Sequence, residues 1–315
     1  MKKILITGGA GYIGGYLTDL LVAQKFDVTV YDNLFFETRY LKEVKFINGD
    51  ITDYNLLNKT LENDYDVIIW LAAVVGDGAC SANPEFTLNT NFESIKNLLK
   101  NYTKKIIFMS TCSVYGHSTS ELNEESEKKP LSLYAKSKIF SEDILVKASN
   151  ENCVFRLGTL FGLGDSVSRI RLDLVVNILS MKAAIGEKLK VFGGEQWRPL
   201  LHVRDVSEAI VFAIKNNIKG TYNLCYKNYK MRSLGEKIIK IFNKDDLELE
   251  ITDNFFEDER NYRVSSEKFR SCGWAPKYDL TYGIKQIRNI VEENRIKDLN
   301  DKIYSNANFT KELYK

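Results

Sequence analysis

The sequence is poor in the residues that build metal centres and disulfide frameworks. It has only two histidines, His117 and His202, and its five cysteines are widely separated, with no Cys-x-x-Cys pair. An odd number of scattered cysteines, in a chain whose first residues run straight into an apolar strand, predicts a reduced cytoplasmic protein without a secretory leader. Because His, Cys and carboxylate side chains form no local cluster, we expect no zinc or iron site.

Charge of one sign and long apolar runs are also missing. Lys and Arg total 44 against 42 acidic residues, a net charge of +2, so nothing indicates the basic surface of a nucleic-acid-binding protein. No apolar stretch reaches the length that crosses a membrane, and we expect a soluble protein without a membrane partner. With only four prolines and no low-complexity tract, the chain shows no linker between independently folding domains.

A glycine-rich turn lies close to the start of the chain. Lys3 to Thr7 form a short apolar run, the segment from Gly8 to Gly14 reads GGAGYIG, and Tyr16 to Gln24 have helical spacing. A second apolar run, Val28 to Tyr31, ends at Asp32. A strand, a glycine turn, a helix and a second strand make the βαβ unit that binds dinucleotides.

The alternation of strands and helices continues along the chain. Further strands are predicted at 44–47, 67–71, 106–110 and 154–157, separated by helices at 56–61, 87–102 and around Tyr134. This pattern predicts an α/β fold with a Rossmann-like, doubly wound parallel sheet. After Gly158 the pattern weakens, and the expected elements are helices at 172–185, 201–215 and 233–242 and a strand at 190–192.

The weaker pattern predicts a smaller, mostly C-terminal α/β region that binds substrate. We assign residues 1–157 to a nucleotide-binding domain, to which 199–225 return, and residues 158–198 and 226–315 to the substrate-binding region. The last stretch, Ile296 to Lys315, is polar, and we expect it to wrap the surface or fray.

The glycine turn and Asp32 together predict an NAD site. Gly8, Gly11 and Gly14 permit a tight turn and let backbone amides approach a pyrophosphate. The Asp32 carboxylate can accept hydrogen bonds from ribose hydroxyls, and since no cation stands near it before Arg39, NAD is favoured over NADP. The residues predicted to contact the cofactor are Gly8, Gly11, Tyr12, Ile13, Gly14, Asp32, Asn33, Asp50, Ile51, Leu71, Ala72, Ala73, Asn91 and Lys138. For Asp50, a solvated loop carboxylate is an equally good interpretation.

Tyr134 and Lys138 predict a proton-transfer site. They lie four residues apart, so on a helix they share one face. A free phenol, with a pKa near ~10, is a poor base at neutral pH. A lysine ammonium favours the phenolate by charge and hydrogen bonding, so Tyr134 can take a proton from a substrate hydroxyl while hydride leaves the same carbon.

Several motifs occur together in the order found in one enzyme family. They are the glycine run, Asp32, Leu71-Ala72-Ala73, STCSVYG at Ser110 to Gly116, Tyr134 with Lys138, and RPLLHVRDV at Arg198 to Val206. With these motifs the chain resembles an extended short-chain dehydrogenase/reductase of the NAD-dependent epimerase/dehydratase family, whose usual substrates are nucleotide-linked sugars. The resemblance covers residue 1 to about Trp274. It implies an oxidoreductase that forms a homodimer or homotetramer through the helix bearing the tyrosine.

The resemblance also implies roles for individual residues. Thr111 holds the position of the hydroxyl residue that supports the catalytic tyrosine, and Asn91 that of an asparagine that organises water near the lysine. Arg198 and Arg260 match arginines that grip the sugar-nucleotide diphosphate, as bidentate guanidinium groups suit phosphate. The predicted catalytic residues are Thr111, Tyr134 and Lys138. The predicted substrate-binding residues are Asp77, Thr159, Asn177, Arg198 and Arg260.

Departures from the family pattern reduce the number of reactions that the sequence is compatible with. Members that act as 4,6-dehydratases carry an acidic residue just before the Val-Tyr-Gly, where this chain has Cys112 and Ser113. Members that epimerise at C3 and C5 have a cysteine two residues before that tyrosine, and here the position is Ser113. Thr159 replaces a common asparagine and Trp70 a common histidine. The loop from Val74 to Cys80 lies where the sugar is expected, although it is equally compatible with a flexible turn.

These absences leave oxidation of a C4 hydroxyl as the simplest chemistry. We therefore predict an NAD-dependent nucleotide-sugar 4-dehydrogenase, with a nucleotide-sugar 4-epimerase as the alternative. The hypothesis from another class is a non-catalytic NAD-binding sensor, against which the intact Thr111, Tyr134 and Lys138 argue. Within the family, the chain also resembles GDP-heptose 4-dehydrogenases of bacterial surface-polysaccharide pathways, a resemblance to a GDP-sugar enzyme that rests on no single residue.

Overall fold

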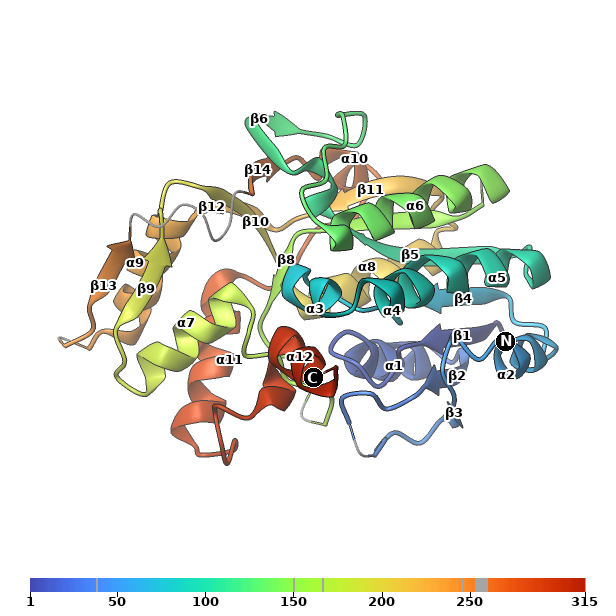
Figure 1. The fold of residues 1–315 in the computed structure, drawn as a ribbon, viewed down its shortest axis with the longest axis horizontal. Helices are drawn as coiled ribbons and strands as arrows, with labels where there is room; N and C mark the ends of the chain where they lie inside the picture. Colours follow the sequence, from blue (N-terminus) through green and yellow to red (C-terminus); the bar gives the residue numbers. More distant parts are fainter. Residues whose placement is uncertain (38, 150, 166, 245, 253–259, 315) are drawn as a thin grey trace.

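A seven-stranded parallel sheet forms the centre of the protein. The computed structural model describes residues 1–37, 39–149, 151–165, 167–244, 246–252 and 260–314. The strand order is β11-β7-β5-β4-β1-β2-β3, and each neighbouring pair is parallel (Figure 1). The strands are β1 Lys3–Thr7, β2 Asp27–Asp32, β3 Lys45–Asn48, β4 Val67–Trp70, β5 Lys105–Thr111, β7 Cys153–Leu157 and β11 Gly220–Leu224. The predicted Rossmann-like sheet is confirmed.

Helices cover both faces of this sheet because successive strand residues point to opposite sides. In β1, Ile4 and Ile6 pack into one apolar cluster with α1 (Gly14–Ala23) and α8 (Val203–Lys215). Leu5 packs into the other cluster, which contains residues of the helices α2 Tyr54–Leu61, α5 Ser94–Asn101 and α6 Leu133–Ala148. The carboxyl ends of the strands therefore stay open between the two helical layers, and this is where α/β sheets bind ligands.

The helix predicted at 87–102 is interrupted by a π-turn. It begins as α4 (Pro84–Leu88), passes through the π-turn Asn89–Glu93 and continues as α5. The loop after β4 also contains a short helix, α3 (Asp77–Ala82), where the sequence suggested a flexible turn. π-turns are frequent at functional sites, and this one places Asn91 behind the loop after β4.

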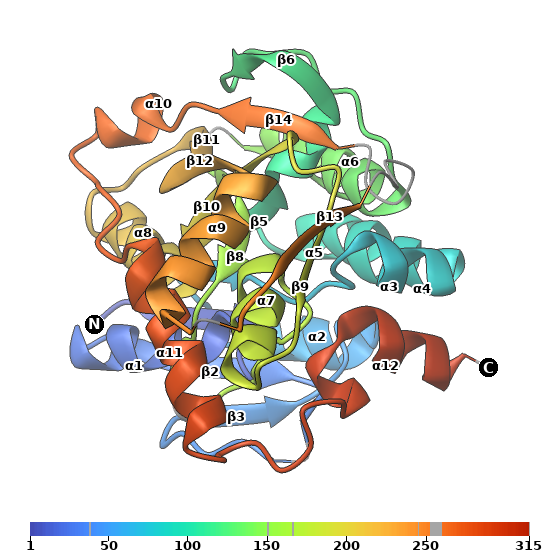
Figure 2. The same ribbon diagram turned by 90° about the vertical axis from the view of Figure 1, so that its left-hand side faces the viewer.

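The second region is built from three small sheets (Figure 2). A three-stranded sheet has the order β12-β10-β8, β9 pairs with β13, and β6 pairs with β14. The strands are β6 His117–Leu122, β8 Thr159–Phe161, β9 Leu189–Phe192, β10 Trp197–His202, β12 Lys227–Lys230, β13 Leu249–Thr252 and β14 Asn261–Val264. The accompanying helices are α7 Val175–Ala184, α9 Met231–Phe242, α10 Glu267–Arg270 and α11 Leu280–Glu292. The division into two domains at 157 stays a prediction.

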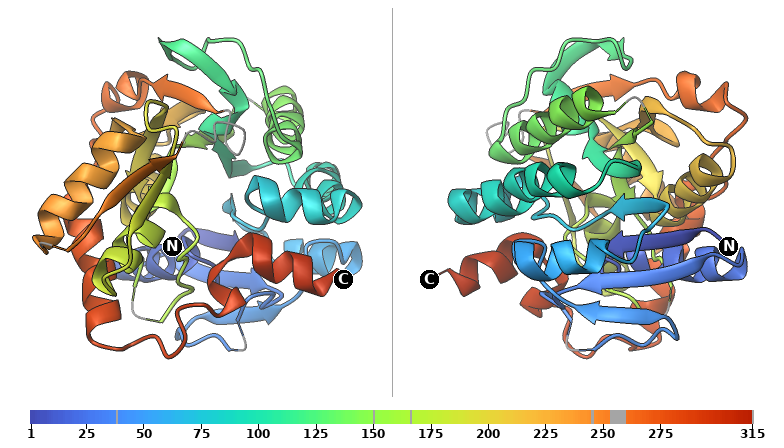
Figure 3. Two further views of the ribbon diagram at one scale, coloured as in Figure 1. Left: turned by 60° about the vertical axis from the view of Figure 1, so that its left-hand side comes forward. Right: turned by 90° about the vertical axis from the view of Figure 1, so that its right-hand side faces the viewer.

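One helix boundary in the C-terminal half was predicted wrongly, and of the two alternatives for the end of the chain the structure shows the ordered one. The helix predicted at 201–215 starts only at Val203, because Leu201 and His202 are strand residues paired with β8 and the His202 ring caps the helix by accepting from the Arg204 N–H at 3.1 Å. The polar end of the chain does not fray. It forms α12 (Asn306–Leu313), drawn in red in Figure 3, which packs against α3.

Candidate active site

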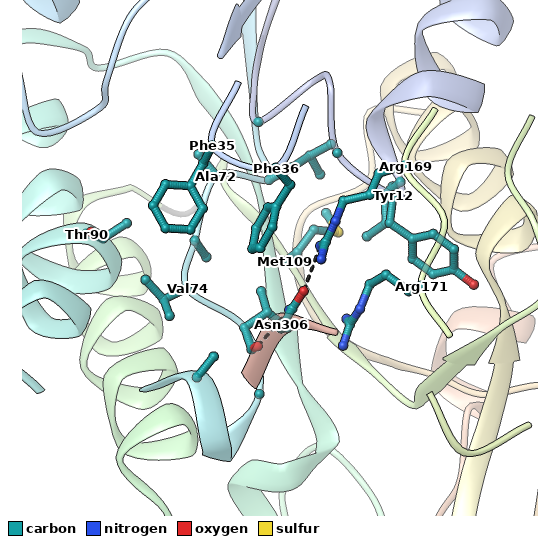
Figure 4. A pocket seen from close by; sticks show the side chains of 18 of the residues that line it. Tyr12, Phe35, Phe36, Ala72, Val74, Thr90, Met109, Arg169, Arg171 and Asn306 are labelled. Carbon is teal, nitrogen blue, oxygen red and sulfur yellow. Dashed lines mark hydrogen bonds between the residues drawn. The ribbon is translucent and has the colours of Figure 1, made fainter. Parts of the chain in front are cut away.

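One cavity of about 310 Å³ lies at the carboxyl ends of the central strands. Both regions of the protein line it, and Figure 4 shows it from close by. The predicted cofactor residues among its lining are Gly8, Gly11, Tyr12, Ile13, Asp32, Asn33, Asp50, Ile51, Leu71, Ala72, Ala73 and Lys138. Thr111, Tyr134, Thr159 and Arg260 line the same cavity. The structure thus brings together residues from one end of the chain to the other.

The glycine turn is closely packed against the strand beside it. Gly8 has φ +73°, and a Cβ on it would lie 2.6 Å from the backbone nitrogen of Ala72. A Cβ on Gly14 would lie 2.4 Å from the carbonyl oxygen of Gly9. Gly14 does not line the cavity, but its missing side chain lets α1 begin directly behind the turn. A diphosphate can therefore approach the backbone amides at the start of α1.

The Asp32 carboxylate joins the glycine turn to the loop after β2. It accepts from the Ala10 N–H at 3.0 Å and from the Leu34 N–H at 2.7 Å. Burial raises the pKa of Asp32, while the two N–H donors lower it. In the same corner, the Asn33 amide donates to the Asp50 carboxylate at 2.8 Å. These acceptors surround the place where a ribose would bind the turn.

Tyr134 and Lys138 lie on the cavity side of α6. The helix begins behind Ser132, whose hydroxyl accepts from the Ala135 N–H at 3.2 Å. Lys138 is 3% exposed, and its Nζ lies 4.8 Å from the centroid of the Phe108 ring. Thr111, the last residue of β5, lines the cavity with Tyr134, and its hydroxyl lowers the pKa of the Tyr134 phenol. The three predicted catalytic side chains therefore meet at one wall of the cavity.

Burial acts on the two titrating groups in opposite directions. It raises the pKa of Tyr134, as do the nearby Cys80 and Asp77, whereas the Thr111 hydroxyl and the Arg171 charge lower it. This rise is opposite to the lowering by Lys138 that the sequence predicted, because burial outweighs the nearby charges. Burial lowers the pKa of Lys138 to about 8, against the raising effect of Cys80 and Glu142. At neutral pH Lys138 is mostly charged, but a modest rise in pH neutralises it.

A buried ion pair supports the helix below Lys138. Arg156 of β7 makes a two-pronged contact with Glu142, at 3.1 Å from Nε and 2.8 Å from Nη2. Glu142 also accepts from the Ser110 hydroxyl, and Arg156 donates to the Tyr115 hydroxyl at 2.8 Å. Lys138 and Glu142 are one helical turn apart, so this network fixes the rotation of α6 that presents Tyr134 to the cavity.

Asn91 holds the loop after β4 and does not line the cavity. Its amide oxygen accepts from the Val74 N–H at 2.8 Å, and its NH₂ group donates to the Val74 carbonyl at 2.9 Å and to the Ser137 hydroxyl at 3.1 Å. Val74 lines the cavity, so Asn91 shapes the site through that loop. No bond remains for a direct contact of its NH₂ group with the cofactor.

The predicted substrate residues divide into two groups. Thr159 and Arg260 line the cavity, and Arg260 forms an ion pair with Asp77 at 3.1 Å. Asp77, Asn177 and Arg198 lie outside the lining. Arg198 donates to the carbonyl oxygens of Trp197 and Arg260, so it supports the segment that carries Arg260.

Asn177 braces a turn instead of facing the cavity. Its side chain accepts from the Gly162 N–H at 2.8 Å and donates to the Arg171 carbonyl at 2.7 Å. His202, interpreted as structural, is fully buried and bonded to Gln286 at 2.8 Å. Burial lowers the pKa of His202 to about 4, so its ring is neutral.

Sequence reasoning missed several residues of the lining. These are Arg169, Arg171, Tyr262, Asn306 and Thr310. The spacing of two arginines after the glycine-rich segment 162–164 was a usable signal for the first two. No local pattern indicates the others, because helix α12 reaches the cavity only through tertiary contacts.

The cavity contains polar atoms that fit a dinucleotide. Thr90 Oγ1, Arg169 Nε and Thr310 Oγ1 are buried, line the cavity and have no hydrogen-bond partner among the described residues. Buried polar atoms are nearly always satisfied, so three such atoms in one cavity indicate a polar ligand. With the glycine turn and the acidic corner at Asp32, they fit NAD.

No three His, Cys, Asp or Glu side chains of the described residues gather where they could ligate a metal ion. Within these residues, none of the helices is both long and apolar enough to cross a bilayer.

Known proteins resemble the chain along most of its length. It is 29% identical over 310 residues to a putative UDP-glucose 4-epimerase of Methanocaldococcus jannaschii, covering 92% of this chain and 99% of that protein. It is 30% identical over 240 residues to UDP-glucuronic acid decarboxylase 1 of Xenopus tropicalis, covering 71% of this chain and 56% of that protein.

A solved structure shares the fold. The UDP-glucose 4-epimerase of Thermus thermophilus in complex with NAD superposes with a TM-score of 0.80 at 23% identity, covering 93% of this chain and all of that one. The family model described as the NAD dependent epimerase/dehydratase family matches residues 4–225, which include the glycine turn, Thr111, Tyr134 and Lys138. The chain is therefore an NAD-dependent enzyme of the epimerase/dehydratase family that acts on nucleotide sugars.

Proposed function

We propose that the protein is a nucleotide-sugar 4-dehydrogenase, which oxidises the C4 hydroxyl and releases a 4-ketosugar. The observation that carries the proposal is that Thr111, Tyr134 and the buried Lys138 line one cavity together. Thr111 and Tyr134 can hold one substrate hydroxyl between them, and the Tyr134 oxygen takes its proton. When bound, NAD supplies the acceptor for the hydride that leaves C4.

The surroundings of Tyr134 support an oxidation without elimination. Cys112 is fully buried, and its thiol donates to the Arg156 carbonyl. The Ser113 hydroxyl pairs with the Tyr262 hydroxyl at 3.2 Å. Neither side chain offers the carboxylic acid that a 4,6-dehydratase requires for loss of water, and Asp77 is engaged by Arg260. This arrangement favours simple removal of hydride.

A nucleotide-sugar 4-epimerase is the second candidate. The relative that matches along 310 residues is named a putative UDP-glucose 4-epimerase. The first half-reaction is the same in both enzymes, and only an epimerase returns hydride to the opposite face of the ketone. The relatives suggest a UDP-sugar, whereas the narrower resemblance suggests GDP-heptose, so both nucleotides belong in the assay.

The test follows cofactor and product together. The protein is incubated with NAD and with UDP-, GDP- or dTDP-linked sugars, NADH is recorded by absorbance, and the product by NMR. Ketosugar formed in step with NADH supports the dehydrogenase. Inverted C4 without net NADH supports the epimerase. A protein that binds NAD but turns over none of the sugars would leave the sensor hypothesis standing.

We also propose a homodimer formed through α6, as the family resemblance implies. Phe140 and Val146 on that helix are 45% and 56% exposed, and the Phe92 ring lies 5.6 Å from that of Phe140. Such an apolar face is typical of a helix that packs against a second copy. Light scattering after gel filtration should give a dimer for the native chain and a monomer for Phe140→Glu.

A further inference from the structure

The C-terminal helix α12 supplies one side of the cavity. Asn306, at its start, is 5% exposed and ties three segments together. Its backbone N–H donates to Asp173 at 2.9 Å, its NH₂ group donates to the Val75 carbonyl at 2.8 Å, and its side-chain oxygen accepts from Arg169 at 2.6 Å. Figure 4 shows Arg169 reaching across to this oxygen. The helix is therefore joined to both walls of the cavity.

Arg169 is a buried cation in the lining. It is 6% exposed, donates from Nη2 to the Ile303 carbonyl at 3.0 Å, and lies over the Phe36 ring at 3.5 Å. Its Nε has no partner within the described chain. Burial lowers the pKa of Arg169 to about 9, which still leaves it charged at neutral pH.

Among the described residues, no carboxylate forms a direct ion pair with Arg169. Arg171 lowers the pKa of Arg169, while Asp173 and Glu37 raise it. Asp173 is itself held by Arg171, at 3.0 and 2.9 Å. A buried guanidinium whose hydrogen bonds go to neutral oxygens can still receive an anion.

The chain before Arg169 lies directly on the glycine turn. A Cβ on Gly15, in the first turn of α1, would meet the Ser168 side chain at 2.3 Å. A Cβ on Gly164 would lie 3.1 Å from the Tyr12 carbonyl oxygen. Arg169 therefore stands beside the start of α1, where the glycine turn receives a dinucleotide diphosphate.

Thr310 of helix α12 brings a second buried polar group without a described hydrogen-bond partner to the cavity lining. Thr310 is one turn after Asn306 on the same face, is 1% exposed and lines the cavity, and its hydroxyl has no partner among the described residues. Phe309 packs between Phe35 and Phe36, with ring centroids 5.5 and 5.0 Å away. These aromatic contacts close the helix over the loop that follows Asp32.

We propose that Arg169, positioned by Asn306 and assisted by Thr310, binds the diphosphate of NAD, and that α12 is a lid that must open before the cofactor can exchange. The closed helix leaves the glycine turn, Arg169 and Thr310 as lining of one cavity. The assignment depends on the cofactor of the family and not on the sugar reaction, so it stands whether the enzyme is a dehydrogenase or an epimerase.

The test measures binding and release of NADH by the full chain, without a sugar substrate. Release is followed by fluorescence after dilution into excess NAD for the native chain, Arg169→Met and Asn306→Ala. Since a charge-assisted hydrogen bond contributes more than a neutral one, we expect Arg169→Met to weaken NADH binding by about 10- to 100-fold. Asn306→Ala should speed release by about 10-fold, because Arg169 and the Val75 loop lose their shared partner.

Two control variants carry the same kinds of substitution at exposed positions. Arg295→Met removes an arginine whose side chain is 63% exposed, and Asn308→Ala changes an exposed asparagine on the same helix, so both should release NADH at the native rate. Affinities for ADP and adenosine are compared as well. Loss of the Arg169 charge should weaken ADP but leave adenosine unchanged, because only ADP carries the diphosphate.

Other outcomes would overturn the proposal. If Arg169→Met weakens UDP or GDP but not ADP, Arg169 belongs to the substrate diphosphate. If Asn306→Ala releases NADH at the native rate, α12 is no lid. Circular dichroism checks folding, and if Arg169→Met does not fold, Arg169→Lys takes its place: it keeps a charge but loses the planar fork, so native NADH affinity in that variant counts against the proposal.

Discussion

The two walls of the cavity are assembled in different ways. The wall formed by residues 8–138 comes from consecutive strand ends and the helices after them, held in place by the backbone ladder of the large sheet. The opposite wall comes from three separate pieces, at 157–174, 260–262 and 306–310. Side-chain bonds such as those from Asn306 to Val75 and from Arg169 to Asn306 join these pieces.

The two walls should therefore respond differently to mutation. A change in the first wall acts on the reacting groups or on the sheet itself. A change in the second wall removes one or two side-chain bonds, so it should alter ligand affinity while the fold persists. The following predictions test this contrast, starting with the largest effect.

Replacing Tyr134 by Phe should abolish turnover while NADH binding persists. The substitution removes the hydroxyl that takes the proton, and we expect kcat to fall by about 10³-fold or more. Steady-state kinetics and NADH fluorescence measure the two quantities. Tyr54→Phe, on α2 and outside the cavity lining, is the matched control. Turnover within about tenfold of the native rate would remove Tyr134 from the mechanism.

Replacing Gly8 by Ala should destabilise the fold far more than the same change at another glycine of similar conformation. Gly186 has φ +76° and nothing within 4 Å of its position for a Cβ, so alanine there suffers only backbone strain, about 1 kcal/mol. At Gly8 the clash with Ala72 is added, and we expect a loss of at least about 3 kcal/mol. Urea unfolding of both variants gives the comparison. Equal losses would show that the turn adapts to a side chain.

Replacing Glu142 by Gln should move the alkaline fall of kcat to lower pH. Burial lowers the pKa of Lys138 to about 8, and the Glu142 carboxylate opposes this effect. Without the carboxylate the pKa of Lys138 falls further, so the ammonium is lost earlier as the pH rises. The pH profile of kcat measures the shift, with circular dichroism to verify folding because the partner Arg156 is left buried. An unchanged profile would separate Lys138 from the alkaline limb.

Replacing His202 by Asn should flatten the acid side of the stability profile. The pKa of His202 is about 4 in the folded chain and about 6.5 when unfolded, so between these values the unfolded state binds more protons and native stability falls as pH falls. The slope approaches about 1.4 kcal/mol per pH unit. Asp205, whose pKa burial raises to about 6, acts in the opposite direction in both proteins.

Unfolding free energies at about pH 7 and about pH 5 measure this smallest effect. Asn can still cap α8, which keeps the comparison fair. Parallel profiles for the native chain and the variant would mean that folding does not lower the pKa of His202.

Local pattern was sufficient to predict the first wall. The apolar run Lys3–Thr7 matches β1 residue for residue, and Gly8, Asp32, Thr111, Tyr134 and Lys138 all reach the cavity. Each of these residues ends or directly follows a strand, or lies on the helix that carries Tyr134. Parallel strands then place their carboxyl ends at one edge without further information.

The second wall could not be predicted in the same way. Thr310 and Asn306 lie in a polar stretch with no apolar period, and they reach the cavity because α12 packs on α3, far away in the sequence. Arg198 was expected to grip a diphosphate, yet it holds the backbone of Arg260. Such positions depend on which segments meet, and a motif does not encode that.

The π-turn at Asn89–Glu93 has a consequence for how insertions and deletions are tolerated. The turn contains one residue more than a regular helical turn. Asn91 lies within it and hydrogen-bonds both the backbone N–H and the carbonyl oxygen of Val74. Deleting a single residue of the turn would restore the ordinary helical period between α4 and α5 and remove the bulge that carries Asn91. Length is therefore as strictly constrained here as side-chain identity, and a shortened chain could not recover the site by any substitution at Asn91 alone.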